Sequence, residues 1–441
     1  MTLDPGLLPL GFLLLTALAL AGVPLAAAAF FSGVLMLGLN PTPLPNGFML
    51  NYSLAMRLNS PALISIPLFA LAGELAVAAG ITERLLNVAD ILAGRGKNAV
   101  GARTIFGCTL FATVSGVGPA AVTAEGKRLI PDMLRSGYRP QAAAAAIAAA
   151  AGLAIIIPAS VPLTIYAATT GIQTNIVFTA SFIPGLLIAG SLFLVTMIYA
   201  SFQRSKGRDS SPHSSTSSQK IHLVILNDAK WALLMPLLVL SALFTGLLTA
   251  PEAAAFASVY AVAIGFLCHK SLKTSDLKKA LANAATVASA VLLLAGVGGL
   301  FTMLLDACGF SQRLSDAIYA FSGGAAGSIL VINGILLAAG CFLDMPAIIN
   351  LVVPPLLPLA VLCGMSLPHF GVMVVVNIAI GLLTPPQAHN ISAAARQAGV
   401  SMSDAAKAAW PYLLAMTSCL LAVSYIPDLS LWLPGLFGWR W

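Results

Sequence analysis

The feature that most constrains this chain is a succession of apolar runs long enough to cross a lipid bilayer. Such runs include Ile176–Ala200, Trp231–Leu248 and Ala284–Leu305, and only 8% of the 441 residues are charged. A helix needs about 20 apolar residues to cross a bilayer, and within lipid only helices and closed barrels satisfy every backbone polar group. The sequence therefore predicts an all-α, multi-pass membrane protein with roughly 10 to 12 membrane segments.

The placement of basic residues predicts an orientation. Lys and Arg gather in the serine-rich stretch Ser201–Leu223 and in the shorter stretch His269–Lys279. Loops rich in Lys and Arg favour the cytoplasmic side, so both stretches are expected there. One integrated membrane domain is expected, with four parts: a first half (1–200), a serine-rich basic cytoplasmic loop (201–230), connecting helices (231–280) and a second half (281–441).

The two halves contain an internal repeat, whose matching parts we call the first copy and the second copy. An offset of 229 residues pairs the motif GITERL (Gly80–Leu85) with GFSQRL (Gly309–Leu314). An offset of 227 pairs four further residues with identical ones: Pro119 with Pro346, Pro131 with Pro358, Gly137 with Gly364, and Pro158 with Pro385. Because proline and glycine restrict or relax the backbone, their recurrence predicts a repeated backbone plan.

The charges of the two copies predict opposite orientations in the membrane. Four basic residues lie between Lys127 and Arg139, whereas the corresponding stretch Pro354–Ser366 has no charged residue. If Lys and Arg mark the cytoplasmic side, the copies point in opposite directions. Inverted repeats with broken helices in matching places are typical of secondary transporters, so this is the fold class that we predict, with broken or re-entrant helices.

Helix breakers and small polar residues occur together in four stretches, which we call the breaks: Thr113–Pro119, Ile157–Pro162, Ala339–Pro346 and Gly381–Asn390. Where Pro and Gly interrupt a helix, backbone carbonyls and amides lose their partners and can bind a ligand. Carbonyl and hydroxyl oxygens suit Na⁺, and the N-termini of half-helices suit an anion. The alternative is that these residues only permit kinks and close helix packing. Their occurrence in repeat-matched pairs favours binding.

The breaks supply the candidate site residues. Candidate Na⁺ ligands are Thr113, Ser115, Gly116, Gly118, Gly340, Asp344, Thr384 and Pro385. Candidate substrate-binding residues are Ser160, Asp344, Pro386 and Asn390. A carboxylate such as Asp344 within an apolar stretch is costly, so it is either functional or placed at a helix end in contact with water. Glu74 and Glu252 are weaker candidates, and His389, which follows a helix break, is expected to be a polar interface residue rather than a ligand.

Other classes of function are disfavoured by missing motifs. The sequence has no HExxH, no GxSxG and no pair of carboxylates within one apolar segment, so an intramembrane enzyme is not expected. The six cysteines are scattered and form no CxxC or metal-ligand spacing. The net charge of +7 lies in short loops, as the positive-inside rule requires, and does not indicate nucleic-acid binding. No cofactor is expected, and Na⁺ would serve as the coupling ion.

Several longer motifs occur in a specific order along nearly the whole chain: SIPLFALAGELAVAAGITERL, FATVSG, IPDMLRSGY, IIIPASVPLTIYA, GLLTAPEAAAFASVYA, FLDMPAIINLVVPPLLP and NIAIGLLTPP. In these motifs the chain resembles the large membrane subunit of tripartite ATP-independent periplasmic (TRAP) transporters. The resemblance implies a bacterial or archaeal inner-membrane permease that takes up organic acids by Na⁺ symport, with an elevator-type movement. It also implies a separate small four-helix membrane subunit and a periplasmic substrate-binding protein.

The chain departs from the family's usual pattern at three breaks. Val117 stands where the family commonly has serine, Ala159 where it has a second proline, and Gln387-Ala388 where it has Val-Gly. The missing hydroxyl at Val117 makes backbone carbonyls the expected ion ligands there, and the departures prevent a transfer of substrate identity. The alternative function is a stand-alone Na⁺/divalent-anion symporter of similar fold, which needs no binding protein.

Overall fold

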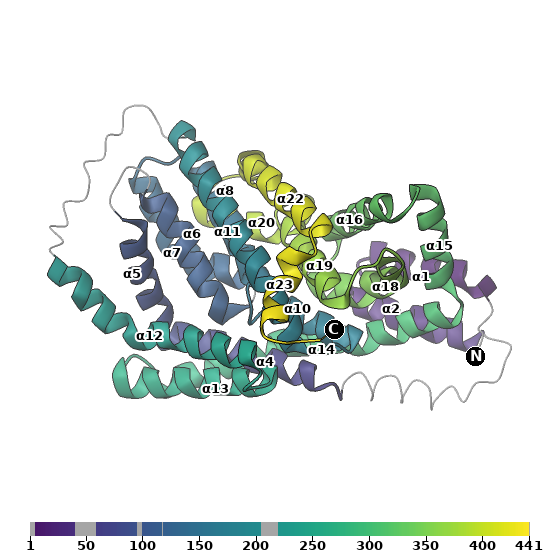
Figure 1. Cartoon of the computed structure of the whole chain (residues 1–441), viewed down its shortest axis with the longest axis horizontal. Coiled ribbons are helices and arrows are strands. Elements are labelled where there is room, and N and C mark those ends of the chain that lie inside the picture. The colour runs from purple at the N-terminus through teal and green to yellow at the C-terminus, as the bar shows by residue number, and fades with distance from the viewer. Residues whose placement is uncertain (1–4, 40–58, 95–98, 117, 204–218, 441) are drawn as a thin grey trace.

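The computed structural model describes residues 5–39, 59–94, 99–116, 118–203 and 219–440, and this part of the chain contains helices and no β-strand (Figure 1). The described residues contain eight helical segments long and apolar enough to cross a membrane, or nine if one bent pair, Met402–Ala408 with Trp410–Tyr425, is counted as a span. The expected multi-pass helical protein is therefore confirmed. The described residues also contain four shorter apolar helices: Leu8–Leu20, Leu25–Gly38, Ala99–Thr113 and Leu367–Gly381.

The two copies consist of matching series of helices. The first copy comprises α5 (Ile81–Ala93), α6 (Ala99–Ser115), α7 (Gly118–Arg135), α8 (Pro140–Ala151), α9 (Leu153–Ile156), α10 (Val161–Thr170) and α11 (Thr174–Gln203). The second copy comprises α15 (Phe310–Ser322), α16 (Ala325–Phe342), α17 (Met345–Ala347), the π-helical turn η3 (Ile348–Val352), α18 (Val353–Leu362), α19 (Leu367–Gly381), α20 (His389–Ala398), α21 (Met402–Ala408) and α22 (Trp410–Tyr425).

The helix boundaries follow the offsets found in the sequence. Helices α5 and α15 begin at positions that the offset of 229 equates, and each is preceded by a glycine in the left-handed region, Gly80 with φ +66° and Gly309 with φ +68°. Helices α7 and α18 end at positions that the offset of 227 equates, and Gly137 and Gly364 follow with φ +85° and +79°. The repeat in sequence is thus a repeat in backbone structure.

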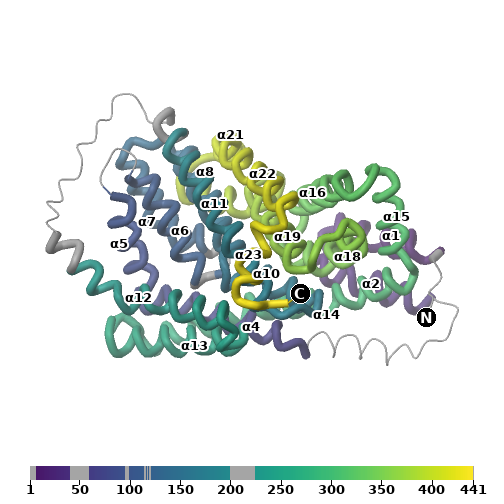
Figure 2. The backbone as a smooth tube through the Cα atoms, in the orientation of Figure 1, coloured from purple at the N-terminus to yellow at the C-terminus, as the bar shows by residue number. Residues whose placement is uncertain are grey.

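The equivalent helices of the two copies lie on opposite sides of a central group. Helices α5, α6 and α7 lie at one end of the molecule, and α15, α16 and α18 lie toward the other, with α8, α10, α11 and α19 between them (Figures 1 and 2). Helix α8 packs against α7 of the first copy and α20 of the second. Its residues 142–151 are nine alanines and one isoleucine, all buried. Small side chains let neighbouring helices approach closely, so α8 brings the two copies together.

Four further helices border the copies along one side: α4 (Pro61–Ala78), α12 (Gln219–Thr245), α13 (Ala250–Ala263) and α14 (Thr274–Ala307). Helix α4 packs against α13 and α14, and α12 packs against α5. The Arg84 Nε atom lies 3.1 Å from the Asp228 Oδ2 atom, which joins α5 to α12. Helices α1 (Leu8–Leu20) and α2 (Leu25–Gly38) pack together near α14, and α23 (Asp428–Leu436) packs on α11.

The connector between the halves is shorter than the sequence suggested. Helix α11 continues to Gln203 and α12 begins at Gln219, so residues 219–230, expected in the loop, are helical. Residues 204–218, the centre of the expected loop, lie outside the described residues.

Two acidic residues that the sequence marked as weak candidates make local contacts. Glu74 on α4 accepts a hydrogen bond from Asn283 Nδ2 of α14 at 2.9 Å. Glu252 accepts hydrogen bonds from the backbone N–H and the hydroxyl of Thr249, both at 2.8 Å, and so caps the start of α13. Neither lies at the four breaks.

Candidate functional site

The first copy brings its two breaks into direct contact. Helix α6 ends at Ser115, and Gly116 has φ +63°. The Val161 N–H, at the start of α10, donates to the Gly116 carbonyl oxygen at 3.2 Å. A methyl group added at Gly116 would collide with the Ala159 carbonyl oxygen. The tip between α6 and α7 therefore closes on the break between α9 and α10, at a distance that only glycine permits. The Ser115 side chain, a predicted Na⁺ ligand, lies outside the described part of the structure.

The second copy repeats this arrangement. The Gln387 N–H donates to the Cys341 carbonyl oxygen at 3.2 Å, which joins the break after α19 to the end of α16. The Gln387 side-chain Nε2 donates to the next carbonyl, that of Phe342. Helices α16 and α19 also cross at two glycines, because a methyl group added at Gly381 would lie only 2.7 Å from the Gly340 Cα atom. In each copy, a main-chain hydrogen bond thus joins two broken helices that are distant in sequence.

Asp344 lies at the break that follows α16, immediately before α17. Its side chain is 67% exposed, and its Oδ1 atom lies 3.5 Å from Nε2 of His389, whose side chain is 45% exposed. The carboxylate therefore lies at a helix end and is exposed. A helix end in contact with water is one of the two explanations that the sequence allows for this acid. His389 begins α20, so the pair joins the two breaks of the second copy.

Asn390 connects the second copy to the first. It is fully buried, and its Nδ2 donates to the Ala148 carbonyl oxygen of α8 at 3.1 Å. The backbone N–H of Asn390 donates to the Leu382 carbonyl oxygen at 3.1 Å, across the break. A methyl group added at Gly118 would lie 3.2 Å from Asn390 Oδ1, so the two breaks meet here. No described residue donates a hydrogen bond to this oxygen.

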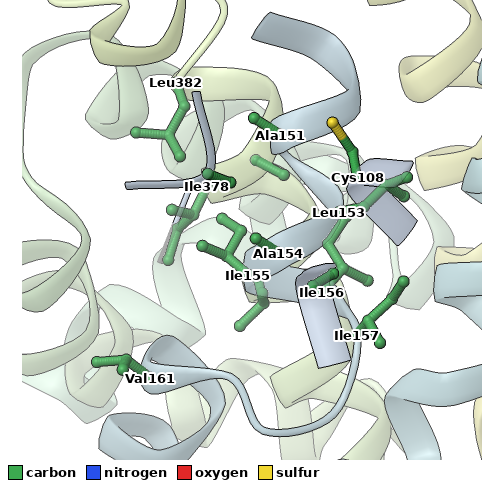
Figure 3. Close-up of a cluster of buried hydrophobic side chains, with 14 of the residues drawn as sticks. Cys108, Ala151, Leu153, Ala154, Ile155, Ile156, Ile157, Val161, Ile378 and Leu382 are labelled. Atoms are coloured by element: carbon green, nitrogen blue, oxygen red, sulfur yellow. The ribbon is translucent and has the colours of Figure 1, made fainter. Parts of the chain in front are cut away.

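Apolar packing encloses the meeting point of the two copies. Figure 3 shows Ile378 and Leu382 of the second copy beside α9 and Ala151 of the first. Every residue of α9 is buried, and so are Ile378 and Leu382. The backbone groups near the contact between Gly118 and Asn390 therefore lie in apolar surroundings.

The remaining predicted residues occupy three kinds of position. The Ser160 hydroxyl is fully buried, donates to the Ile155 carbonyl oxygen and accepts from the Leu163 N–H at 3.4 Å, so it caps α10. The Thr113 hydroxyl donates to a carbonyl of its own helix α6 at 2.7 Å, and the Thr384 hydroxyl, in the break after α19, donates to the Ile380 carbonyl of that helix at 2.9 Å; both oxygens keep their lone pairs. Pro385 and Pro386, joined by a cis peptide bond, are exposed.

A buried polar chain near the Gly340–Gly381 crossing was missed by the sequence analysis. Asn377 Nδ2 of α19 donates to Asn333 Oδ1 of α16 at 2.7 Å, and Asn333 Nδ2 donates to Ser424 Oγ of α22 at 3.0 Å. All three residues are at most 3% exposed. Single asparagines within apolar runs were the available signal, because polar residues at membrane depth are costly unless paired.

The arrangement defines a class of membrane protein. Two matching sets of broken helices meet at the centre of a polytopic helical fold, as in secondary transporters built from repeats. Within the described residues, no group of three or more His, Cys, Asp or Glu side chains could hold a metal ion. Residues 10–429 match the family model of the DctM component of tripartite ATP-independent periplasmic transporters, so the chain belongs to this family.

Proteins similar in sequence to this chain are also named as permease proteins of TRAP transporters. The chain is 31% identical to the C4-dicarboxylate TRAP transporter large permease protein DctM of Rhodobacter capsulatus, over 85% of this chain and 87% of that protein. It is 29% identical to the sialic acid TRAP transporter large permease protein SiaM of Vibrio cholerae, over 95% and 96%. It is 32% identical to the isethionate TRAP transporter permease protein DctMQ of Oleidesulfovibrio alaskensis, over 86% of this chain and 59% of that protein. The chain is thus a TRAP large permease subunit and not an enzyme.

Proposed function

We propose that this subunit imports a small organic acid, as a carboxylate, across the inner membrane of a bacterium or archaeon by symport with Na⁺. The observation that carries the proposal is the contact between the two copies at Gly118 and Asn390, where both sets of broken helices meet. A repeated set of breaks around one centre offers backbone groups to an anion and a cation at once.

The helix ends support binding of both charges. Helices α7, α10 and α20 begin at the breaks and bring partly positive N-termini there, which favour a carboxylate. Helices α6, α16 and α19 end at the breaks and bring carbonyl oxygens, which favour Na⁺. Thr113 and Thr384 add hydroxyl oxygens with free lone pairs. Asp344 adds an exposed negative charge whose pairing with His389 depends on imidazole protonation.

The proposed transport cycle moves the two copies against α4, α12, α13 and α14 in an elevator-type motion. The first copy is expected to open to the cytoplasm and the second to the opposite side, in accordance with the basic residues of the first copy. A cysteine at Ser210, which lies outside the described residues, should then react with an impermeant thiol reagent only from the cytoplasmic side. Labelling from the opposite side would contradict this orientation.

The proposed partners are a separate small four-helix membrane subunit and a periplasmic binding protein that delivers the substrate. Family membership supports this proposal over a stand-alone symporter. The test is reconstitution in vesicles with an inward Na⁺ gradient. Substrate uptake should require the small subunit, the binding protein and Na⁺ together, and each omission should remove it. Full uptake by the purified chain alone would favour the stand-alone symporter.

A further inference from the structure

A buried acid that the proposed site does not use lies on α7. Glu125 is fully buried, and no described residue donates a hydrogen bond to either of its carboxyl oxygens. Its Oε2 atom faces α6, because a methyl group added at Gly107 would lie 3.6 Å from it. The next residue of α6 is Cys108, which is also buried. The carboxyl group therefore lies between α6 and α7 in the first copy, in apolar surroundings.

The nearest cations are already paired with other acids. Arg128, one turn along α7, lies 3.6 Å from Asp90 and donates to Asn87 at 2.9 Å. Arg103 of α6 lies 3.0 Å from Asp90 and also pairs with Asp132. Burial raises the pKa of Asp90, although Arg103 and Arg128 oppose this effect. Among the described residues, neither cation forms an ion pair with Glu125: burial raises the pKa of its carboxyl group to about 8, and the charges of Arg128 and Arg103 oppose this rise only in part.

In the described residues, the other helices that cover α7 supply no ion-pair partner for Glu125. Helices α8 and α9 contain no titratable residue. Helix α20 carries His389, which faces Asp344, and Arg396, which donates to Ser392 at 3.1 Å. On α6 the titratable residues are Arg103 and Cys108. An ionised carboxylate is strongly disfavoured without a partner, so Glu125 is held here as the neutral acid.

The second copy shows that the fold does not require this acid. The offset of 227 equates Glu125 with Val352, the last residue of η3, whose side chain is half-buried. The equivalent position of the second copy is occupied by an apolar valine. A buried carboxyl group at this position of the first copy therefore indicates a role other than packing.

A polar route leads from Glu125 toward water along the same helix. Arg128 and Asp132 follow it one and two turns later, and their side chains are 37% and 28% exposed. Residues spaced by three, four or seven positions share a face of a helix. Small movements between α6 and α7 would therefore connect the carboxyl group to the charged end of α7.

We propose that Glu125 is a proton-binding site of the transporter. The neutral acid present in this conformation releases its proton to water when α7 moves relative to α6, and takes one up when the packing is restored. Only the oxygen–hydrogen bond of the carboxyl group breaks and forms, and water carries the proton. The link to transport rests on the proposed function, whereas the protonation of Glu125 does not.

The first experiment measures protonation without transport. The purified chain in lipid vesicles is treated at a series of pH values with a hydrophobic carbodiimide, which reacts with protonated carboxyl groups, and the adducts are located by mass spectrometry. Glu125 should be labelled at neutral pH, and labelling should fall by about tenfold for each pH unit above the midpoint, as for one titrating group. Glu125→Gln should lose this adduct, and Glu83→Gln, which alters an exposed acid of α5, should keep it. Absence of labelling at every pH would overturn the proposal.

The second experiment measures uptake by the complete system at saturating Na⁺. The parental rate should change with pH, and both Glu125→Gln and Glu125→Val, which matches the second copy, should flatten that dependence. If either variant loses net uptake, exchange of substrate between equal concentrations should persist, because it needs no net proton movement. A parental pH profile in Glu125→Gln, or the loss of exchange as well as uptake, would overturn the proposal. Failure of the proposed function would instead leave the parental chain without uptake while Glu125 is still labelled.

Discussion

The two copies share a backbone plan and differ in what they place around it. In the first copy, Gly116 and Ser160 are buried, and the Ser160 hydroxyl is bonded to its own backbone. In the second copy, Asp344 is 67% exposed and lies beside His389. The repeated element is therefore the pair of joined breaks. The side chains have diverged, so that one copy presents enclosed backbone and the other presents charge accessible from outside the fold.

The largest effect is expected from disrupting the contact between the two breaks of the first copy, at Gly116. Gly116→Ala forces a side chain into a left-handed conformation, at a cost of about 1–2 kcal/mol, and drives its methyl group into the Ala159 carbonyl. Uptake should be lost and the thermal unfolding midpoint should fall. Gly171→Ala is the matched control, because its φ is +74° but nothing lies within 4 Å of the added methyl group. Equal losses in both variants would show that the contact between the breaks is unimportant.

A smaller, purely functional effect is expected at the exposed break of the second copy. Asp344→Asn keeps the size and hydrogen bonding of the side chain but removes its charge, so the protein should accumulate normally and lose most uptake. Asp316→Asn, at an exposed acid on α15, should transport normally. Uptake at the parental rate with unchanged Na⁺ dependence would assign Asp344 a structural role only. If Asp344→Asn does not accumulate, Asp344→Glu provides the comparison.

The repeat could be predicted from sequence because proline and glycine determine backbone geometry directly. Pro119, Pro158 and Gly137 therefore showed where the chain would break or turn, and the second copy confirmed the same positions. The breaks also shorten some of the apolar helices. Helix α19, for example, ends at Gly381 after 15 residues, which is fewer than the roughly 20 that a crossing needs.

Side-chain partners could not be predicted in the same way. The Asn377–Asn333–Ser424 chain and the contact of Asn390 with Ala148 join residues that are far apart in sequence. Each depends on how closely two helices approach, and alanine and glycine on the facing helix determine that distance. Sequence spacing within one helix contains no information about it. The isolated acid at Glu125 likewise becomes informative only when its burial and its lack of partners are known.

The central claim is that the joined breaks of the two copies form a Na⁺ site. The most direct measurement is the thermal unfolding midpoint of the purified chain in lipid, with Na⁺ or with K⁺ at equal ionic strength. An ion that binds the folded state raises this midpoint in proportion to the logarithm of its concentration once its site is nearly saturated. We predict stabilisation by Na⁺ alone, with the half-maximal Na⁺ concentration raised by roughly threefold in Ser115→Ala and in Thr384→Ala, as expected when one weak oxygen contact is lost. The same midpoint in Na⁺ and K⁺, or a Na⁺ response unchanged in both variants, would contradict the account.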